Sequence, residues 1–287
     1  MAEPVEPTAL QIGRAEGRKL AGEASGPEDG APLVLVHGLT ATRRTVVHGS
    51  RTLERSGYRV IAYDARGHGE SDPAADPTAY AYPDLADDLD SVTATGRERR
   101  AVLIGHSMGA HTIAAFALRS LERVAGVVFI GPAVTGAPAS AESLREWDRL
   151  AAGLEEGGVE GFVRAYDHDL DPEWRDTLLR ITRDRLGRHR HPEAVAAALR
   201  CVPRSQPFAE LDDLRQVEVP ALVVASHDEA DPGHPYDVAA AWAEHLPQGR
   251  LVSEEPGQSP LAWQGGRLSR EIAAFCEEQA VAERHST

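Results

Sequence analysis

Residues Gly105–Gly109, with the sequence Gly-His-Ser-Met-Gly, have the G-x-S-x-G spacing of a serine nucleophile on a sharp strand-to-helix turn. Such a turn holds the serine in strained backbone angles, and its glycines let neighbouring chain pass close by. The motif follows an apolar run and precedes a helical pattern, which disfavours an ordinary Gly/Ser turn. We therefore expect the Ser107 hydroxyl to stand at a helix N-terminus, where the helix dipole favours developing negative charge, and to act in nucleophilic catalysis.

Short apolar runs that end abruptly alternate with helical patterns along most of the chain. Strands are expected at Leu33–Gly38, Arg59–Asp64, Ala101–Ser107, Gly126–Gly131, Ala221–Ser226 and Arg250–Glu254, after weaker strand-like stretches at Ala9–Arg14 and Arg18–Gly22. Helices are expected at Thr42–Ser56, Tyr82–Thr95, Met108–Val124, Tyr236–Leu246 and Leu268–Ala282. The alternation predicts an α/β fold around a mostly parallel twisted sheet with helices on both faces.

This alternation stops between Pro132 and Val219, where helical periodicity takes over. Helices are expected there at Ala141–Glu156, Val159–Tyr166, Pro172–Leu186 and Pro192–Cys201. A helical insertion between two sheet strands predicts a cap. We expect residues 1–136 and 215–287 to form the core, and residues 137–214 to form the helical cap insertion.

Further motifs accompany the serine. His37–Gly38 follows a strand, Tyr63–Asp72 reads Tyr-Asp-Ala-Arg-Gly-His-Gly-Glu-Ser-Asp, and a D-x-x-x-P loop follows the Ala221 strand. Together with Gly105–Gly109 and the helical cap, they resemble the α/β-hydrolase superfamily, and most closely its serine esterases, lactonases and related perhydrolases. The resemblance covers nearly the whole chain after residue 30. It implies the α/β-hydrolase fold, a Ser-His-acid triad with Ser107 as nucleophile, and an oxyanion hole made by the backbone N–H groups of Leu39 and Met108.

The resemblance places the catalytic acid in the loop after the Ala221 strand. The D-x-x-x-P spacing occurs there twice, as Asp228 with Pro232 and as Asp231 with Pro235. Asp231 is preferred because Pro235 stands where the next helix begins, and Asp228, nearer the strand end, is the alternative acid. The acid holds the imidazole tautomer and stabilises the imidazolium.

A glutamine stands where the resembled family has its catalytic histidine. That histidine follows the last strand, typically in a Gly-His turn, and here the turn reads Gly257-Gln258. A glutamine amide cannot accept a proton near neutral pH, and a serine without a base is a weak nucleophile. Three interpretations stay open: a deliberately inactivated variant, a natural protein with lost or changed activity, or a base supplied by His234 or His106.

Aromatic and histidine side chains are candidates for the substrate pocket. The candidates are His37, His106, Trp147 and Trp263, with Phe162, Tyr166, Trp174 and Phe208 as further cap aromatics. Packing in a helical core is the plain alternative for the cap aromatics, and a structural role is the alternative for His37. His68 and Arg66 are expected to fix their loop.

The cap also contains a basic patch on an otherwise acidic chain. The patch comprises Arg180, Arg183, Arg185, Arg188 and Arg190, with His189 and His191. A solvated helix face is the plain interpretation of this patch. A contact for a substrate carboxylate is the alternative interpretation.

Composition excludes several classes of partner. The formal net charge is −15, with 45 acidic and 30 basic side chains among 287 residues, which disfavours nucleic acid and anionic membranes. No cofactor is expected, because the sequence has no P-loop or dinucleotide fingerprint and no spacing of metal ligands. Two cysteines far apart, and no signal-like or membrane-length apolar stretch, favour a cytoplasmic setting. The oligomeric state is not indicated.

These observations predict a serine hydrolase of small or medium carboxylic esters, lactones included, impaired by Gln258. One alternative is a non-catalytic homologue that binds a small ligand or a protein partner, which Gln258 favours. Another is a Ser-dependent acyltransferase or perhydrolase, which needs the same residues. The serine argues against haloalkane dehalogenase or epoxide hydrolase chemistry, for which related enzymes use aspartate.

Overall fold

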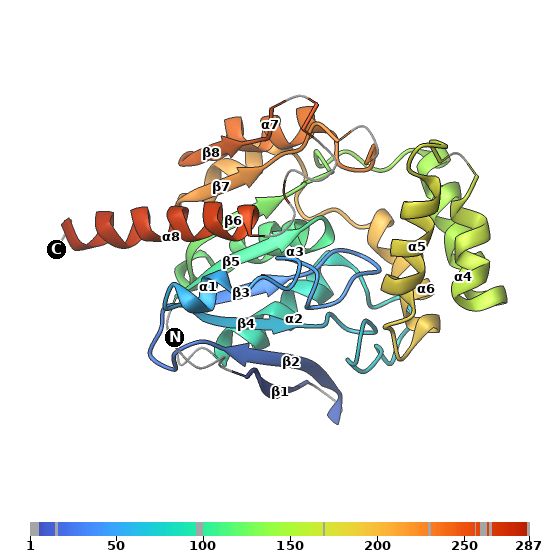
Figure 1. Ribbon diagram of the computed structural model, residues 1–287, viewed down its shortest axis with the longest axis horizontal. Helices are drawn as coiled ribbons and strands as arrows, with labels where there is room; N and C mark the ends of the chain where they lie inside the picture. The colour runs from blue at the N-terminus through green and yellow to red at the C-terminus, as the bar shows by residue number, and fades with distance from the viewer. Residues whose placement is uncertain are drawn as a thin grey trace.

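A computed structural model describes residues 6–14, 17–95, 100–168, 170–228, 231–255, 257–258, 263 and 266–285, the last range with side chains to residue 279. The described strands form one sheet in the order β1-β2-β4-β3-β5-β6-β7-β8 (Figure 1). Their bounds are β1 Thr8–Gly13, β2 Lys19–Ser25, β3 Pro32–Val36, β4 Arg59–Tyr63, β5 Ala101–His106, β6 Val124–Ile130, β7 Ala221–Val224 and β8 Gly249–Val252. β1 and β2 pair antiparallel with their neighbours, and all the other neighbouring strands pair parallel.

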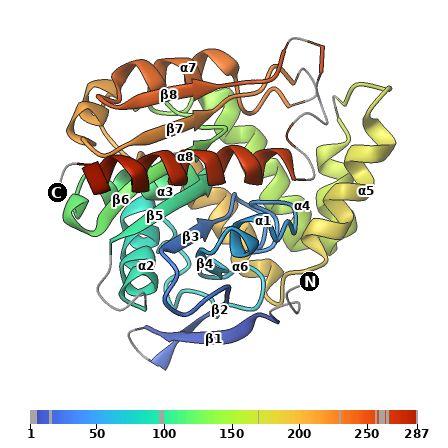
Figure 2. The same ribbon diagram turned by 60° about the vertical axis from the view of Figure 1, so that its left-hand side comes forward.

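Helices cover both faces of the sheet (Figure 2). Helices α2 (Tyr82–Ala94), α3 (Met108–Ala117) and α7 (Tyr236–His245) contribute to one core, and α1 (Thr52–Arg55) and α8 (Arg267–His285) to the other. Alternate residues of β3 face the two cores. Val34 and Val36 belong to the first core, and Leu33 and Leu35 belong to the second. A strand buried on both faces is a continuous apolar run.

A helical insertion lies between β6 and β7, and contains α4 (Ala141–Tyr166), α5 (Arg175–Leu186) and α6 (Pro192–Cys201). Gly158 breaks α4 with φ 58° and ψ −147°, so the two helices predicted on either side of it are both present. The insertion has an apolar cluster of its own and stands to one side of the sheet in Figure 1. The proposal that residues 137–214 form a cap rests on this placement.

Two expected helices were too long. The prediction of a helix over Thr42–Ser56 is wrong: residues 43–49 form turns, with His48 and Gly49 at φ 50° and 72°, and only α1 is helical. The helix after Ser107 ends at Ala117 and not at Val124, because the chain turns through a 3₁₀ segment, Leu121–Arg123, before β6. Among the described helices, none is long and apolar enough to cross a membrane.

Candidate active site

Ser107 occupies a strained turn between β5 and α3. Its backbone angles are φ 53° and ψ −119°, and it is one of few non-glycine residues with positive φ in the described chain. A Cβ at Gly105 would lie 2.5 Å from the Gly109 carbonyl, and a Cβ at Gly109 would overlap the Val36 carbonyl oxygen. These approaches explain the glycine on each side of the motif, and they confirm the turn that the spacing predicted.

The turn after β3 lies against the serine. A Cβ at Gly38 would lie 3.3 Å from the Ser107 Cβ, so the backbone directly before Leu39 passes beside the nucleophile. Thr40 has φ 63°, and the N–H of Ala41 donates to the Gly38 carbonyl at 3.1 Å, which fixes a tight turn around Leu39.

Met108 is the first residue of α3, where a backbone N–H has no acceptor within its own helix. Leu39 and Met108 therefore stay the proposed oxyanion donors.

Three histidines hold the loops around this turn in place through hydrogen bonds to backbone groups. His37 donates from Nδ1 to the Gly38 carbonyl at 2.7 Å and accepts the Ala65 N–H at Nε2 at 2.9 Å. His68, whose ring lies 5.2 Å from that of His37, donates to the Arg66 carbonyl at 3.0 Å. Each ring donates one hydrogen bond to a backbone carbonyl, so each is held as a defined neutral tautomer when its other nitrogen accepts.

The third histidine, His189, comes from the helical insertion. It accepts the Gly69 N–H at Nδ1 and donates from Nε2 to the Thr40 carbonyl, both at 2.8 Å. Burial lowers the pKa of His37, lowers that of His68 further, and lowers that of His189 to about 4. His37 is 1% exposed, so it supports the loop and has no surface with which to line a pocket.

Asp231 and His234 form a hydrogen-bonded pair beside the serine. The Asp231 Oδ2 lies 2.8 Å from the His234 Nδ1. The His234 ring lies 5.2 Å from the ring of His106, and a Cβ at Gly131 would lie 3.3 Å from it. Residues 106 and 131 both adjoin the serine, since the Ser107 N–H donates to the carbonyl of the residue before Gly131 at 2.9 Å.

The neighbours of this pair shift the pKa values of Asp231 and His106. Burial acts to raise the pKa of Asp231, but the hydrogen bond and charge of His234 outweigh it and lower that pKa. Burial, with the charge of His234, lowers the pKa of His106 to about 3. Asp231 therefore stays ionised and His106 stays neutral. His106 is half-buried and Asp231 is exposed.

The other candidate acid, Asp228, precedes this pair by one turn. Its carbonyl accepts the Asp231 N–H at 3.1 Å, and its N–H donates to the Ser226 hydroxyl at 3.1 Å. The imidazole partner at 2.8 Å is what favours Asp231 over Asp228 as the acid.

Gln258 is exposed and follows Gly257, which has φ 87°. Its Oε1 accepts a long hydrogen bond of 3.4 Å from Arg267. Trp263, which the sequence placed near the site, donates from Nε1 to the Ala225 carbonyl and to the Glu254 carboxylate, both at 2.9 Å. Trp263 therefore contacts the end of β7 and the carboxylate that follows β8.

Sequence reasoning missed Glu254. Its carboxylate is 2% exposed and accepts from the Ser226 hydroxyl at 2.6 Å and from the His227 N–H at 2.7 Å. It thus organises the start of the acid loop. An acidic residue two positions beyond β8, beside the predicted catalytic segment, was the signal that could have found it.

The sequence matches the model of a known family. The α/β hydrolase fold family matches residues 31–208. The chain belongs to this family. A non-heme chloroperoxidase of Streptomyces lividans is 29% identical over 80% of this chain and 85% of that protein. A 2-hydroxy-6-oxononadienedioate/2-hydroxy-6-oxononatrienedioate hydrolase of Pseudomonas putida is 32% identical over 69% of this chain and 71% of that protein.

Other curated relatives match over less of their length. The chain spans 55% of a relative from Variovorax paradoxus and 37% of epoxide hydrolase B of Mycobacterium tuberculosis. Among solved structures, an esterase of Thermogutta terrifontis is similar with a TM-score of 0.76 and 25% identity, over 96% of this chain and 99% of that one. A bromoperoxidase of Bacillus anthracis has a TM-score of 0.75 at 19% identity, over 95% of this chain and 100% of that one. The chain is therefore an α/β-hydrolase.

The aromatic pocket candidates of this α/β-hydrolase pack mainly into cores. Phe162 and Phe208 are 2% and 6% exposed, and Trp147 packs against the apolar cluster of the helical insertion. A surface groove of about 660 Å³ between α6 and residues 77–81 contains none of the predicted site residues. In the described part of the chain, no three His, Cys, Asp or Glu side chains are grouped so that they could hold a metal ion.

Proposed function

We propose that this α/β-hydrolase hydrolyses small or medium carboxylic esters, lactones included, through an acyl-enzyme on Ser107. His234 acts as the base and Asp231 as the acid. The observation that carries the proposal is the Asp231–His234 hydrogen bond of 2.8 Å beside the strained serine turn. It supplies an imidazole whose ring lies 5.2 Å from that of His106, the residue before the nucleophile, although residue 258 is glutamine.

The proposed reaction has two halves. Because the His234 Nδ1–H donates to Asp231, the Nε2 is left to accept the proton of Ser107 as its Oγ attacks the ester carbonyl. The N–H groups of Leu39 and Met108 stabilise the oxyanion, and each such donor is worth roughly 3–4 kcal/mol by mutagenesis of related chemistry.

The ester C–O bond then breaks, and the proton on His234 passes to the leaving alcohol. A water molecule, deprotonated by the same imidazole, attacks the acyl-enzyme. The carboxylic acid and the free Ser107 hydroxyl result.

Two further functions have support. Gln258 favours a homologue that binds a small ligand or a protein partner without turnover, because its amide cannot act as a base. The similarity to a chloroperoxidase favours acyl transfer to an acceptor other than water, such as peroxide, at the same residues. Product analysis with competing acceptors separates this transfer from hydrolysis.

The test is hydrolysis of p-nitrophenyl butyrate by the chain itself and by Ser107→Ala, His234→Ala and Gln258→His. We expect the unaltered chain to turn over, and both alanine variants to lose about 10³-fold or more in kcat. His245→Ala, at the far end of α7, is the matched control and should keep its rate. Activity only in Gln258→His would show that residue 258, and not His234, is the position of the base. Inactivity of every form would favour a homologue that binds without turnover.

A further inference from the structure

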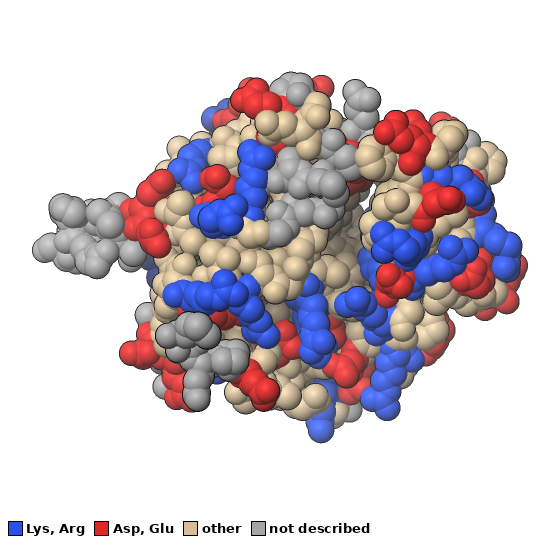
Figure 3. Space-filling view, in the orientation of Figure 1, with Lys and Arg blue, Asp and Glu red and all other residues tan. Residues whose placement is uncertain are grey.

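The arginines near the end of α5 differ in their surroundings. Arg180, Arg183, Arg188 and Arg190 are exposed, and Arg183 pairs with Glu160 at 2.8 Å. Figure 3 shows basic and acidic side chains intermixed over this part of the surface. Most of the predicted basic patch is therefore a solvated face, as its plain interpretation expected. Arg185 is the exception, because protein surrounds its side chain and leaves it only partly exposed.

Arg185 has no partner among the described residues. Its Nε has no accessible surface and no hydrogen-bond acceptor, and no carboxylate of the described chain forms an ion pair with it. Burial lowers the pKa of its guanidinium. A buried cation without a partner is costly, and a guanidinium presents its donors in a rigid planar fork. Such a group is ready to bind an anion that arrives with a ligand.

The charge of Arg185 acts on the residues of the candidate site. It lowers the pKa of His106, which directly precedes Ser107, and contributes to lowering the pKa of Asp231. It also acts on Tyr166 at the end of α4. Geometry agrees with this, because Arg185 lies in the last turn of α5, four residues before His189, whose imidazole donates to the Thr40 carbonyl next to Leu39. The end of α5 that holds Arg185 therefore lies against the loop of the proposed oxyanion donor.

We propose that Arg185 binds a free carboxylate carried by the ester substrate, so that the preferred substrates are half-esters of dicarboxylic acids or similar carboxylate-bearing esters. This inference rests on the proposed function of Ser107. A carboxylate matches the planar fork with two parallel hydrogen bonds. It also carries the one negative charge that one guanidinium balances.

The test compares two 4-nitrophenyl esters that share the same glutaryl chain: mono-(4-nitrophenyl) glutarate, which is anionic, and its neutral methyl ester. The quantity measured is the ratio of kcat/KM for the anionic ester to that for the neutral ester. We expect this ratio to fall about tenfold or more in Arg185→Gln, chiefly through the KM of the anionic ester, and to be partly restored in Arg185→Lys. Arg188→Gln, an exposed arginine beyond the same helix, is the matched control and should leave the ratio unchanged. An unchanged ratio in Arg185→Gln would overturn the proposal.

A second measurement separates this inference from the proposed function. If neither ester is hydrolysed, the proposed function fails, and calorimetric titration with glutarate then decides about Arg185. Glutarate binding that weakens about tenfold or more in Arg185→Gln would establish a carboxylate site without turnover. Absence of glutarate binding to the unaltered chain would refute the site as well.

Discussion

The imidazole of His189, in the helical insertion, donates a hydrogen bond of 2.8 Å to the backbone carbonyl of Thr40, in the core. Thr40 directly follows Leu39, one of the two proposed oxyanion donors, and has φ 63°. The same imidazole accepts the Gly69 N–H at 2.8 Å. One side chain therefore ties the insertion to two core loops and holds the residue beside the oxyanion turn in a strained conformation.

This relationship predicts the effect of changing His189. His189→Ala removes both hydrogen bonds and should lower kcat by about tenfold, since a small misplacement of a catalytic group is costly. It should also lower the free energy of unfolding by about 1–2 kcal/mol. His189→Gln, whose amide can both donate and accept, should recover most of kcat. Steady-state kinetics and urea unfolding check both effects, and equal behaviour of the two variants would argue against the role of the hydrogen bonds.

Acid should destabilise the fold through its buried neutral histidines. Burial lowers the pKa of His106 and of His111 to about 3, and that of His189 to about 4. The unfolded chain binds protons at these groups near pH 6.5, while the folded chain does not. Their contribution is therefore complete above about pH 6.5 and is lost as the pH falls toward the folded-state values.

The measurement is the free energy of unfolding in urea at pH 8, 7, 6 and 5, above the range where carboxylates titrate. Each histidine contributes a slope of at most about 1.4 kcal/mol per pH unit. His111 accepts the Ala133 N–H at 2.9 Å and lies 2.8 Å from the Tyr82 hydroxyl, so His111→Gln should flatten the slope. A stability that does not change between pH 8 and pH 5 would contradict this account.

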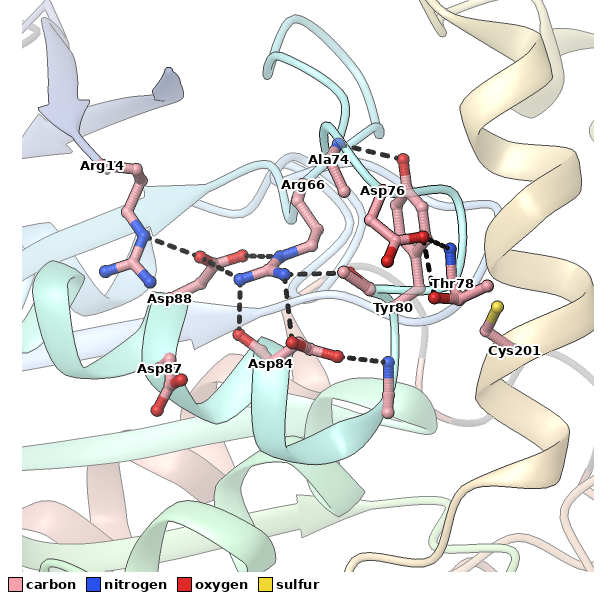
Figure 4. Close-up of polar contacts among 12 residues, drawn as sticks. Arg14, Arg66, Ala74, Asp76, Thr78, Tyr80, Asp84, Asp87, Asp88 and Cys201 are labelled. Atoms are coloured by element: carbon pink, nitrogen blue, oxygen red, sulfur yellow. Dashed lines mark hydrogen bonds and ion pairs between the residues drawn. The ribbon is translucent and has the colours of Figure 1, made fainter. Parts of the chain in front are cut away.

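The carboxylate of Asp88 should be far more important for stability than that of its neighbour Asp87. Asp88 is 2% exposed, accepts from Arg66 at 2.6 Å and 2.8 Å, and pairs with Arg14 at 2.8 Å (Figure 4). Asp88→Asn leaves buried arginine charge uncompensated and should cost about 3 kcal/mol. Asp87→Asn, which breaks an exposed pair with Arg119, should cost under about 1 kcal/mol. Urea unfolding at pH 7 measures both, and similar losses would contradict the assignment.

The glycine after Met108 should not tolerate a side chain. A Cβ at Gly109 would overlap the Val36 carbonyl, whereas a Cβ at Gly13 would have no neighbour within 4 Å. Gly109→Ala should therefore cost about 2–3 kcal/mol and abolish activity, while Gly13→Ala should change little. Thermal unfolding and ester hydrolysis test this pair. Full stability and activity of Gly109→Ala would show that the turn around Ser107 can accommodate a side chain at this position, contrary to its geometry.

The sequence predicted the sheet and the serine turn well because both depend on local signals. Buried parallel strands are continuous apolar runs, and only glycines fit where chain segments cross beside Ser107. The helix expected over Thr42–Ser56 failed because turns with positive φ replaced it, a choice that tertiary contacts make.

The details of the candidate site depend on loops that meet only in the folded chain. Nothing local indicates that His189 reaches Thr40, or that Arg185 turns inward while its neighbours stay exposed. The pairing of Asp231 with His234 was within reach, because the two are three residues apart and His234 was already an alternative base. Asp231, Gln258 and the oxyanion residues stay predictions about catalysis until they are tested.

The most direct test of the account is covalent labelling by a fluorophosphonate, which an activated serine attacks with loss of fluoride. Peptide mass spectrometry locates the adduct, and its rate of formation is compared in the unaltered chain, in His234→Ala and in His245→Ala. The account predicts one adduct on Ser107, formed about 10²-fold or more slowly in His234→Ala and at an unchanged rate in His245→Ala. Absence of any adduct on Ser107, or labelling of Ser107 that does not depend on His234, would contradict it.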